Sequence, residues 1–158
     1  MLNLSINDIK NTKIWEEVGI KLPIFDYDKV VAATKANPEW VHFGAGNIFR
    51  GFIAVLQQRL LNEGKANSGI IAVETFDEEI IDKVYTPYDN LGLLVIMKAD
   101  GTLDKEVVAS ITEGLVGDPS REEDWQRLQE IFVNPALKLV SFTITEKGYS
   151  LKNMQGEY

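Results

Sequence analysis

Apolar residues along this chain form short unbroken runs that alternate with longer amphipathic stretches, and this alternation predicts an α/β fold. The runs at 40–43, 69–74 and 137–145 are expected to be strands of a mostly parallel sheet. The run at 69–74 is unbroken up to its final acid, which is typical of a parallel strand buried on both faces. Between the first two runs, residues 47–62 repeat apolar side chains at helical spacing. This helix is predicted to pack on the sheet by one stripe, which consists of Phe49, Phe52, Ile53, Leu56, Leu60 and Leu61.

Two further apolar runs, at 91–98 and 106–111, flank Asp100-Gly101, a dipeptide that favours a tight hairpin turn. An antiparallel hairpin is therefore expected as an elaboration of the parallel sheet. Residues 114–119 are predicted to be a loop. Ser120 is then predicted to open a helix with a capping box, whose inward side chains are Trp125, Leu128, Ile131 and Phe132.

The first 38 residues show little periodicity, apart from a helix that Asp26 or Asp28 can cap and that Asn37-Pro38 ends. Because this segment precedes the first predicted strand, it is expected to be an arm packed on the outside of the fold. Residues 39–158 are predicted to form the α/β unit itself.

The first predicted strand runs directly into a glycine-rich turn, Gly44-Ala45-Gly46, and the long helix follows at once. Glycine can adopt the conformations that such a turn needs, and it lets a ligand approach the main chain. The helix points its free N–H groups and positive dipole end at whatever lies over the turn, most often a pyrophosphate. The turn therefore predicts a dinucleotide site. Phe49 occupies the third position of G-x-G-x-x-G, so a turn that only joins a strand to a helix stays an alternative.

Glu74 ends the second predicted strand, at the same sheet edge as the glycine turn. In dinucleotide folds an acid at this position takes the hydroxyl hydrogens of the adenosine ribose and repels a 2′-phosphate, so NAD is expected in preference to NADP. An exposed loop carboxylate, or a cap for the helix near Asp77, is the alternative.

The last predicted strand ends in hydroxyl residues where a nicotinamide and its ribose would lie, which makes Thr143, Thr145 and Glu146 candidates for cofactor binding. Thr143 and Thr145 could equally be strand residues without a ligand, and Glu146 a solvated loop charge. His42, in the first strand, is expected to be a hydrogen-bonded core residue more readily than a ligand or base.

The composition narrows the class of protein. The chain has 158 residues, 45% of them hydrophobic, and a net charge of −8, which argues against a surface that follows a nucleic-acid backbone. The absence of cysteine and the single histidine exclude thiolate and histidine-rich metal centres. No apolar run approaches the roughly 20 residues that cross a bilayer, and the first ten residues are polar, so a cytoplasmic protein is expected.

Two motifs together resemble a known family. Residues 43–52, Phe-Gly-Ala-Gly-Asn-Ile-Phe-Arg-Gly-Phe, resemble the G-x-G-x-x-x-R motif of the mannitol dehydrogenase family, the polyol-specific long-chain dehydrogenases. The form G-x-G-N-x-x-R is most similar to the hexuronate branch, the tagaturonate and fructuronate reductases. Residues 143–149, Thr-Ile-Thr-Glu-Lys-Gly-Tyr, resemble the second family motif, T-x-T-E-x-G-Y. The resemblance covers residues 40–149.

The resemblance implies a Rossmann-like, doubly wound and mostly parallel sheet, and hydride transfer between NAD and a hexuronate or polyol of the fructuronate/mannonate, tagaturonate or mannitol type. It implies cofactor binding by the turn and helix start, at Gly44, Ala45, Gly46, Asn47, Ile48, Phe49 and Arg50. Glu74 would hold the adenosine ribose. Arg50 could instead pair with a carboxylate of the fold.

The chain also departs from the family. Family enzymes are several times longer, and a second, helical domain carries their catalytic lysine in a K-x-x-x-x-N-x-x-H motif that nothing here matches. The chain is therefore expected to be an incomplete domain with no catalytic residue, inactive alone, which meets its sugar acid or polyol through the missing domain. A non-catalytic nucleotide-binding module is the main alternative, and a methyltransferase a weaker one. The oligomeric state is open.

Overall fold

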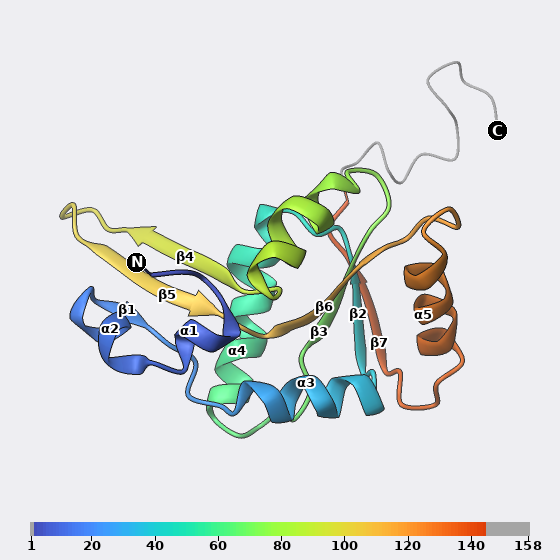
Figure 1. Cartoon of the computed structure of the whole chain (residues 1–158), viewed down its shortest axis with the longest axis horizontal. Helices are drawn as coiled ribbons and strands as arrows, with labels where there is room; N and C mark the ends of the chain where they lie inside the picture. The colour runs from blue at the N-terminus through green and yellow to red at the C-terminus, as the bar shows by residue number, and fades with distance from the viewer. Residues whose placement is uncertain (1, 145–158) are drawn as a thin grey trace, which may run out of the picture.

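The computed structural model describes residues 2–144, which fold around a four-stranded sheet with the order β6-β3-β2-β7 (Figure 1). All three pairings in this sheet are parallel. The strands are β2 (Trp40–Phe43), β3 (Ile70–Glu74), β6 (Ile111–Val116) and β7 (Leu139–Phe142). The predicted Rossmann-like parallel sheet is confirmed.

Helices cover both faces of this sheet, as a doubly wound fold requires (Figure 1). One face packs on the helix after β2, formed by η1 (Phe49–Ile53) and α4 (Ala54–Asn62), and on η2 (Ile81–Tyr85), which continues into η3 (Thr86–Tyr88). The other face packs on α5 (Glu122–Phe132). Successive residues of β3 alternate between the two faces: Ile70 and Ala72 belong to the first core cluster, and Ile71 and Val73 to the second.

A second sheet has the order β1-β5-β4 and lies beside the first (Figure 1). Its antiparallel hairpin, β4 (Gly92–Met97) and β5 (Leu103–Val108), confirms the hairpin predicted at Asp100-Gly101. The short strand β1 (Ile20–Lys21) pairs with β5 in parallel. The remaining elements of the N-terminal segment are α1 (Ile6–Ile9), α2 (Thr12–Glu17) and α3 (Tyr27–Ala36), and Asp26 caps α3 by accepting the N–H of Lys29.

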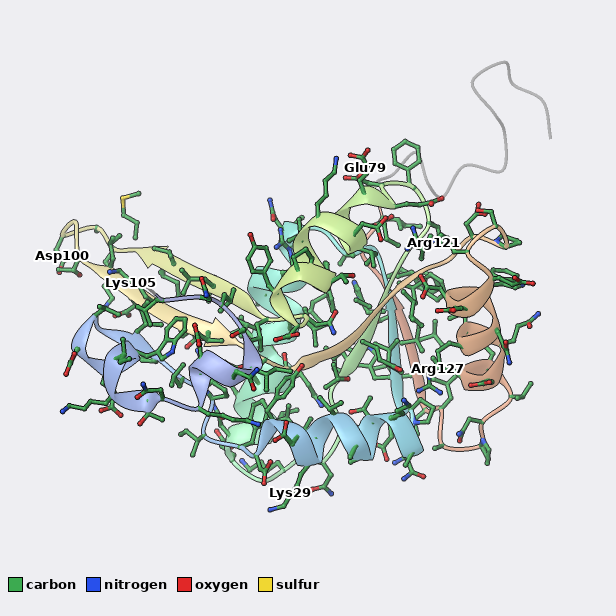
Figure 2. All side chains as sticks on the ribbon, in the orientation of Figure 1. Lys29, Glu79, Asp100, Lys105, Arg121 and Arg127 are labelled. Atoms are coloured by element: carbon green, nitrogen blue, oxygen red, sulfur yellow. The ribbon has the colours of Figure 1, made fainter. Side chains whose placement is uncertain are left out.

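The loop predicted at 114–119 is wrong in its first half, because β6 runs to Val116 and is the third parallel strand. The apolar pattern there is interrupted by Glu113 and Gly114. Arg127 of α5 neutralises the carboxylate of Glu113 by two hydrogen bonds of 3.0 Å, and Figure 2 labels it between α5 and the sheet. The side chain of Tyr85 packs over Gly114, where a Cβ atom would meet it at 3.2 Å. The predicted second hairpin strand correspondingly ends at Val108 and not at Ile111.

The apolar stripe predicted for the long helix is also only partly correct. Phe49 and Leu61 are buried, but Phe52, Leu56 and Leu60 are exposed to 61%, 51% and 42%. The reason is the π-helical turn of η1, which inserts an extra residue and so rotates everything after it relative to a regular 3.6-residue repeat. The buried face continues from Phe49 to Ala54, Gln57, Gln58 and Leu61.

The helix at 122–132 begins without the predicted capping box, since Arg121 occupies the N-cap position and its side chain makes no capping bond. Asp124 in the first turn accepts the N–H of Val116 at 2.9 Å instead, which ties α5 to the end of β6. Leu128 and Ile131 face inward as expected, whereas Phe132 is 48% exposed. Within residues 2–144, no helix combines the length and the apolar character that crossing a membrane would take.

Candidate functional site

Gly44 is the point where β2 ends, and it is held on two sides by neighbouring strands. Its N–H donates to the carbonyl of Val73 at 2.9 Å, and its carbonyl accepts the hydroxyl of Thr143 at 3.0 Å. Its φ of +101° is a conformation that favours glycine. A Cβ atom here would also lie 2.5 Å from the carbonyl oxygen of Thr143, so no other residue fits.

Gly46, two residues later, has the opposite surroundings. Apart from its two neighbours in the chain, no heavy atom of the described residues lies within 4 Å of a Cβ built on Gly46, and its φ is not positive. The N–H groups of Gly46, Asn47 and Ile48 find no acceptor among residues 2–144, as expected for the first turn of a helix. The turn therefore offers free donors beside open space, which is the arrangement that an anionic group needs.

Glu74 lies beside this turn, as its place at the end of β3 predicts. Its Oε2 accepts the N–H of Ala45 at 2.9 Å, and its Oε1 accepts the N–H groups of Thr75 and Phe76 at 3.0 Å. Three backbone donors therefore fix the carboxylate. The alternative of a freely solvated loop acid does not fit these contacts.

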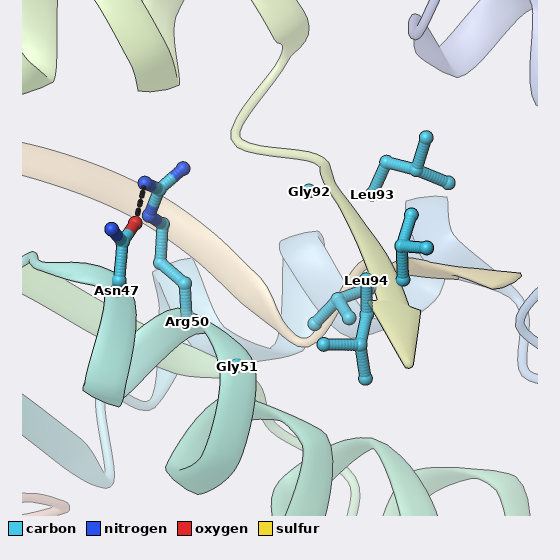
Figure 3. Close-up of a pocket in the computed structure, with 8 residues that line it drawn as sticks. Asn47, Arg50, Gly51, Gly92, Leu93 and Leu94 are labelled. Carbon is cyan, nitrogen blue, oxygen red and sulfur yellow. Dashed lines mark hydrogen bonds between the residues drawn. The ribbon is translucent and has the colours of Figure 1, made fainter. Parts of the chain in front are cut away.

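Arg50 stands one helical turn after Gly46. Its Nη2 donates to the Oδ1 of Asn47 at 2.5 Å, and its guanidinium carbon lies 5.9 Å from the centroid of the Tyr85 ring. Its Nε is buried without a hydrogen-bond partner in the described residues, and Arg50 forms no ion pair there. The side chain borders a cavity of about 360 Å³ between the helix start and β4 (Figure 3). A positive group without a carboxylate partner in the described residues thus lies beside the turn.

His42 is fully buried between strands, as predicted for a core histidine. Its Nδ1 lies 2.7 Å from the hydroxyl of Ser141, and its Nε2 lies 2.9 Å from the hydroxyl of Thr143. Burial lowers the pKa of the His42 imidazole to about 4, so the ring is neutral near pH 7. Its face stacks on the ring of Phe49 with centroids 4.1 Å apart, which explains why the third glycine position holds an aromatic residue: helix and strand meet through two flat rings.

The structure brings most of the predicted site residues together at one edge of the sheet. Gly44 to Arg50 form the turn and helix start, Glu74 binds the turn from β3, and Thr143 binds it from the end of β7. The side chain of Ile48 points outward and is 72% exposed. Thr145 and Glu146 lie outside the described residues.

Sequence reasoning missed three residues that support the turn. The hydroxyl of Tyr85 donates to the carbonyl of Ala45 at 2.7 Å, and burial raises the pKa of this phenol, which keeps it a donor. Ser141 and Trp40 complete the surroundings of His42, with the indole N–H of Trp40 donating to Ser141 at 2.7 Å. Ser141 could have been found from the alternation of β7, because it shares a face with Thr143. Tyr85 carried no such signal.

Comparison with known proteins agrees with this geometry. The family model of the mannitol dehydrogenase Rossmann domain matches residues 38–156. D-mannonate oxidoreductase of Thermotoga maritima is 52% identical over 155 residues, which cover 98% of this chain and 29% of that protein.

Two solved structures share the fold. D-sorbitol dehydrogenase in its substrate-free form matches with a TM-score of 0.70 at 26% identity, over 87% of this chain and 27% of that one. The ternary complex of Pseudomonas fluorescens mannitol 2-dehydrogenase with NAD and D-mannitol matches with a TM-score of 0.69 at 25% identity, over 89% of this chain and 27% of that one. The chain thus spans less than a third of the length of each of these relatives.

Proposed function

The chain belongs to the mannitol dehydrogenase family, and from that premise we propose that it forms the NAD-binding part of an oxidoreductase. The reaction is hydride transfer between the nicotinamide and a hexuronate or polyol. The mannonate type of substrate is favoured, because the D-mannonate oxidoreductase of Thermotoga maritima shares 52% of its residues with this chain over 155 positions.

The observation that carries this proposal is the contrast between the two glycines of the turn. Gly44 is enclosed by Thr143, whereas Gly46 faces open space next to three N–H groups without acceptors in the described residues. A glycine that the fold itself does not need, at the positive end of a helix, fits a pyrophosphate that approaches the main chain.

The roles of the site residues follow from their positions. Residues 44–50 line the pyrophosphate, and Arg50 contributes a positive charge that no carboxylate neutralises within residues 2–144. Glu74 accepts hydrogen bonds from the adenosine ribose, for which its backbone contacts hold it in place, and its negative charge disfavours the 2′-phosphate of NADP. Thr143 supports the turn through its hydroxyl, which donates to the carbonyl of Gly44. Roles for Thr145 and Glu146 near the nicotinamide stay predictions.

When bound, NAD supplies hydride acceptance and donation at C4 of the nicotinamide. The residues of this chain hold and orient the adenosine and pyrophosphate portions. The groups that bind the sugar acid or polyol and move its proton belong, on this proposal, to a second domain. We also propose that residues 39–158 are the N-terminal part of the dinucleotide-binding domain and residues 1–38 an arm. The cytoplasmic location and the absence of a nucleic-acid partner stay predictions.

The experiment that tests the proposal is a titration of the full-length protein with NADH and, separately, NADPH, followed by nicotinamide fluorescence. Gly46→Ala is the key variant, because its Cβ meets nothing in the fold but would meet a bound pyrophosphate. We expect saturable binding that favours NADH, and at least a tenfold loss of NADH affinity in Gly46→Ala.

Gly101→Ala is the matched control for that variant. Gly101 lies at the hairpin tip, also faces open space, and has a φ of +83°, so alanine there costs more stability than alanine at Gly46. The affinity of Gly101→Ala for NADH should lie within twofold of that of the unmodified protein. Binding of neither nucleotide by a folded sample would contradict the proposal. Saturable NADH binding without any sugar-acid or polyol oxidation by the full-length protein would favour the non-catalytic module instead.

A further inference from the structure

A continuous chain of hydrogen bonds runs from Trp40 through His42 to the glycine turn. The indole N–H of Trp40 is 2.7 Å from the hydroxyl oxygen of Ser141, which is 2.7 Å from the Nδ1 of His42. The Nε2 of His42 is 2.9 Å from the hydroxyl oxygen of Thr143, which is 3.0 Å from the carbonyl oxygen of Gly44. The chain of bonds thus links four side chains from two neighbouring segments of the sheet and ends at one backbone carbonyl.

The two ends of this chain determine where each proton lies. The carbonyl of Gly44 can only accept, so Thr143 must donate its one hydroxyl proton to it, and Thr143 must then accept a proton from the Nε2 of His42. At the other end, the indole of Trp40 can only donate. Ser141 accepts that proton and donates its own to the Nδ1 of His42.

Only one form of His42 satisfies every bond: the neutral ring with its proton on Nε2. With the proton on Nδ1 instead, two hydroxyl groups would have to reverse, and the Gly44 carbonyl would lose its donor. A doubly protonated ring would leave the Ser141 hydroxyl proton without an acceptor and would place a charge in a fully buried position. Both ring nitrogens are engaged, so His42 has no atom free to bind a ligand or to act as a base.

We propose that His42 is a positioning residue for the nucleotide site: in its neutral form with the proton on Nε2, it holds the Gly44 carbonyl through Thr143 and thereby sets the direction of the N–H groups at Gly46 and Asn47. This inference rests on the proposed NAD-binding function. The stacking of His42 on Phe49 adds a second point of contact, on the first turn of the helix itself. His42 is therefore linked to the turn through Thr143 and contacts the helix directly through Phe49.

The first test is the proton arrangement, measured by nitrogen-15 NMR of the histidine ring in the unmodified protein without cofactor. We expect the neutral form with a protonated Nε2 and an unprotonated Nδ1 at pH 7. Since His42 is the only histidine among these 158 residues, its signals need no assignment by mutation when the 158-residue chain is the sample. A protonated Nδ1, or an imidazolium, would overturn the inference, and this readout requires no variant to fold.

The second test compares His42→Phe with Thr34→Val. His42→Phe keeps a ring against Phe49 but releases Thr143, so we expect the backbone amide signals of residues 44–47 to shift and NADH affinity to fall at least fivefold. Thr34→Val removes a buried hydroxyl of α3 that donates to the carbonyl of Val30 at 2.8 Å and accepts the N–H of Gly69 at 2.7 Å, away from the glycine turn. It should lower stability while NADH affinity stays within twofold.

The outcomes separate this inference from the proposed function. If the unmodified protein binds NADH and His42→Phe binds it equally well, the positioning role is refuted and the function stands. If the unmodified protein does not bind NADH, the proposed function fails, and the amide signals alone decide whether His42 orders the turn: unchanged signals at 44–47 in His42→Phe refute it. Equal losses of affinity in both variants would indicate a general effect of stability and would also overturn it.

Discussion

The Oε2 of Glu74 accepts the backbone N–H of Ala45 at 2.9 Å, although the two residues are 29 positions apart in the sequence. The acid at the end of β3 is therefore bonded to the middle residue of the glycine turn. The group that we propose to recognise the ribose and the turn that we propose to receive the pyrophosphate would thus move as one unit. This coupling also means that removing the Glu74 side chain disturbs the turn, so its role has to be tested by a substitution that keeps the shape.

Glu74→Gln removes the charge and retains the size of the side chain, but its amide nitrogen cannot accept the N–H of Ala45, so the readout is the ratio of two affinities that share the same turn. Because a neutral amide no longer repels a 2′-phosphate, we expect the ratio of NADPH affinity to NADH affinity to rise about tenfold, or about 1.4 kcal/mol. Fluorescence titrations with both nucleotides measure the ratio. Glu79→Gln is the control, since this acid pairs with Lys83 at the surface and carries the same change of charge (Figure 2). A ratio that stays the same in Glu74→Gln would refute discrimination by Glu74.

Gly44→Ala should unfold or severely destabilise the protein. An alanine at this position would have to adopt a φ of +101°, which costs about 1–2 kcal/mol by itself. Its Cβ would also lie 2.5 Å from the carbonyl oxygen of Thr143. We expect a loss of at least about 3 kcal/mol in urea unfolding. In Gly101→Ala, which has the strained φ but no clash, the loss should be only about 1–2 kcal/mol. Similar losses in the two variants would show that Gly44 is not enclosed as described.

The helix face can be tested by exchanging a polar and an apolar residue. Gln58 is buried and bonds both to the carbonyl of Val107 at 2.8 Å and to the N–H of Ala109 at 2.6 Å. Gln58→Leu leaves these two backbone groups unpaired, so we expect a loss of about 2–4 kcal/mol in urea unfolding. Leu56→Gln should change stability by less than about 0.5 kcal/mol, because Leu56 is exposed. If Leu56→Gln cost more stability than Gln58→Leu, the regular helical stripe predicted from the sequence would be correct instead.

The stability of the protein should depend on His42 between about pH 4 and pH 6.5. Burial lowers the pKa of His42 to about 4 from an ordinary 6.5, so in this range the unfolded chain binds a proton that the folded chain does not. The stabilisation is complete above pH 6.5 and is lost as the pH falls to about 4, at about 1.4 kcal/mol for each pKa unit. Urea unfolding of the unmodified protein and of His42→Phe, measured at several pH values, isolates this contribution from that of the carboxylates. The stability difference between them should shrink as the pH falls; a constant difference would contradict the lowered pKa.

The parts of the fold that could be predicted have local causes. The apolar run 40–43, the glycines after it and the acid at position 74 each follow from rules that act within a few residues. The hairpin follows from Asp100-Gly101 in the same way. Both family motifs are likewise short stretches of sequence, which is why the Rossmann-like sheet and the family could be inferred before the structure was known.

The parts that could not be predicted depend on contacts between distant segments. Strand β6 forms because Glu113 finds Arg127 and Gly114 accommodates Tyr85, and none of these contacts is visible in its own sequence. The extra residue in η1 shifts the buried face of the helix onto Gln57 and Gln58, whose side-chain amides bond to backbone groups of other segments.

The sequence alone therefore determined which residues meet at the sheet edge, since the carboxyl ends of parallel strands must coincide. Only the tertiary structure decided how they act on one another. It joined Glu74 to Ala45, and it linked His42 to the Gly44 carbonyl through Thr143. The physical reason is that a hydrogen bond depends on distances of about 3 Å between atoms that the chain brings together only when the whole sheet has formed.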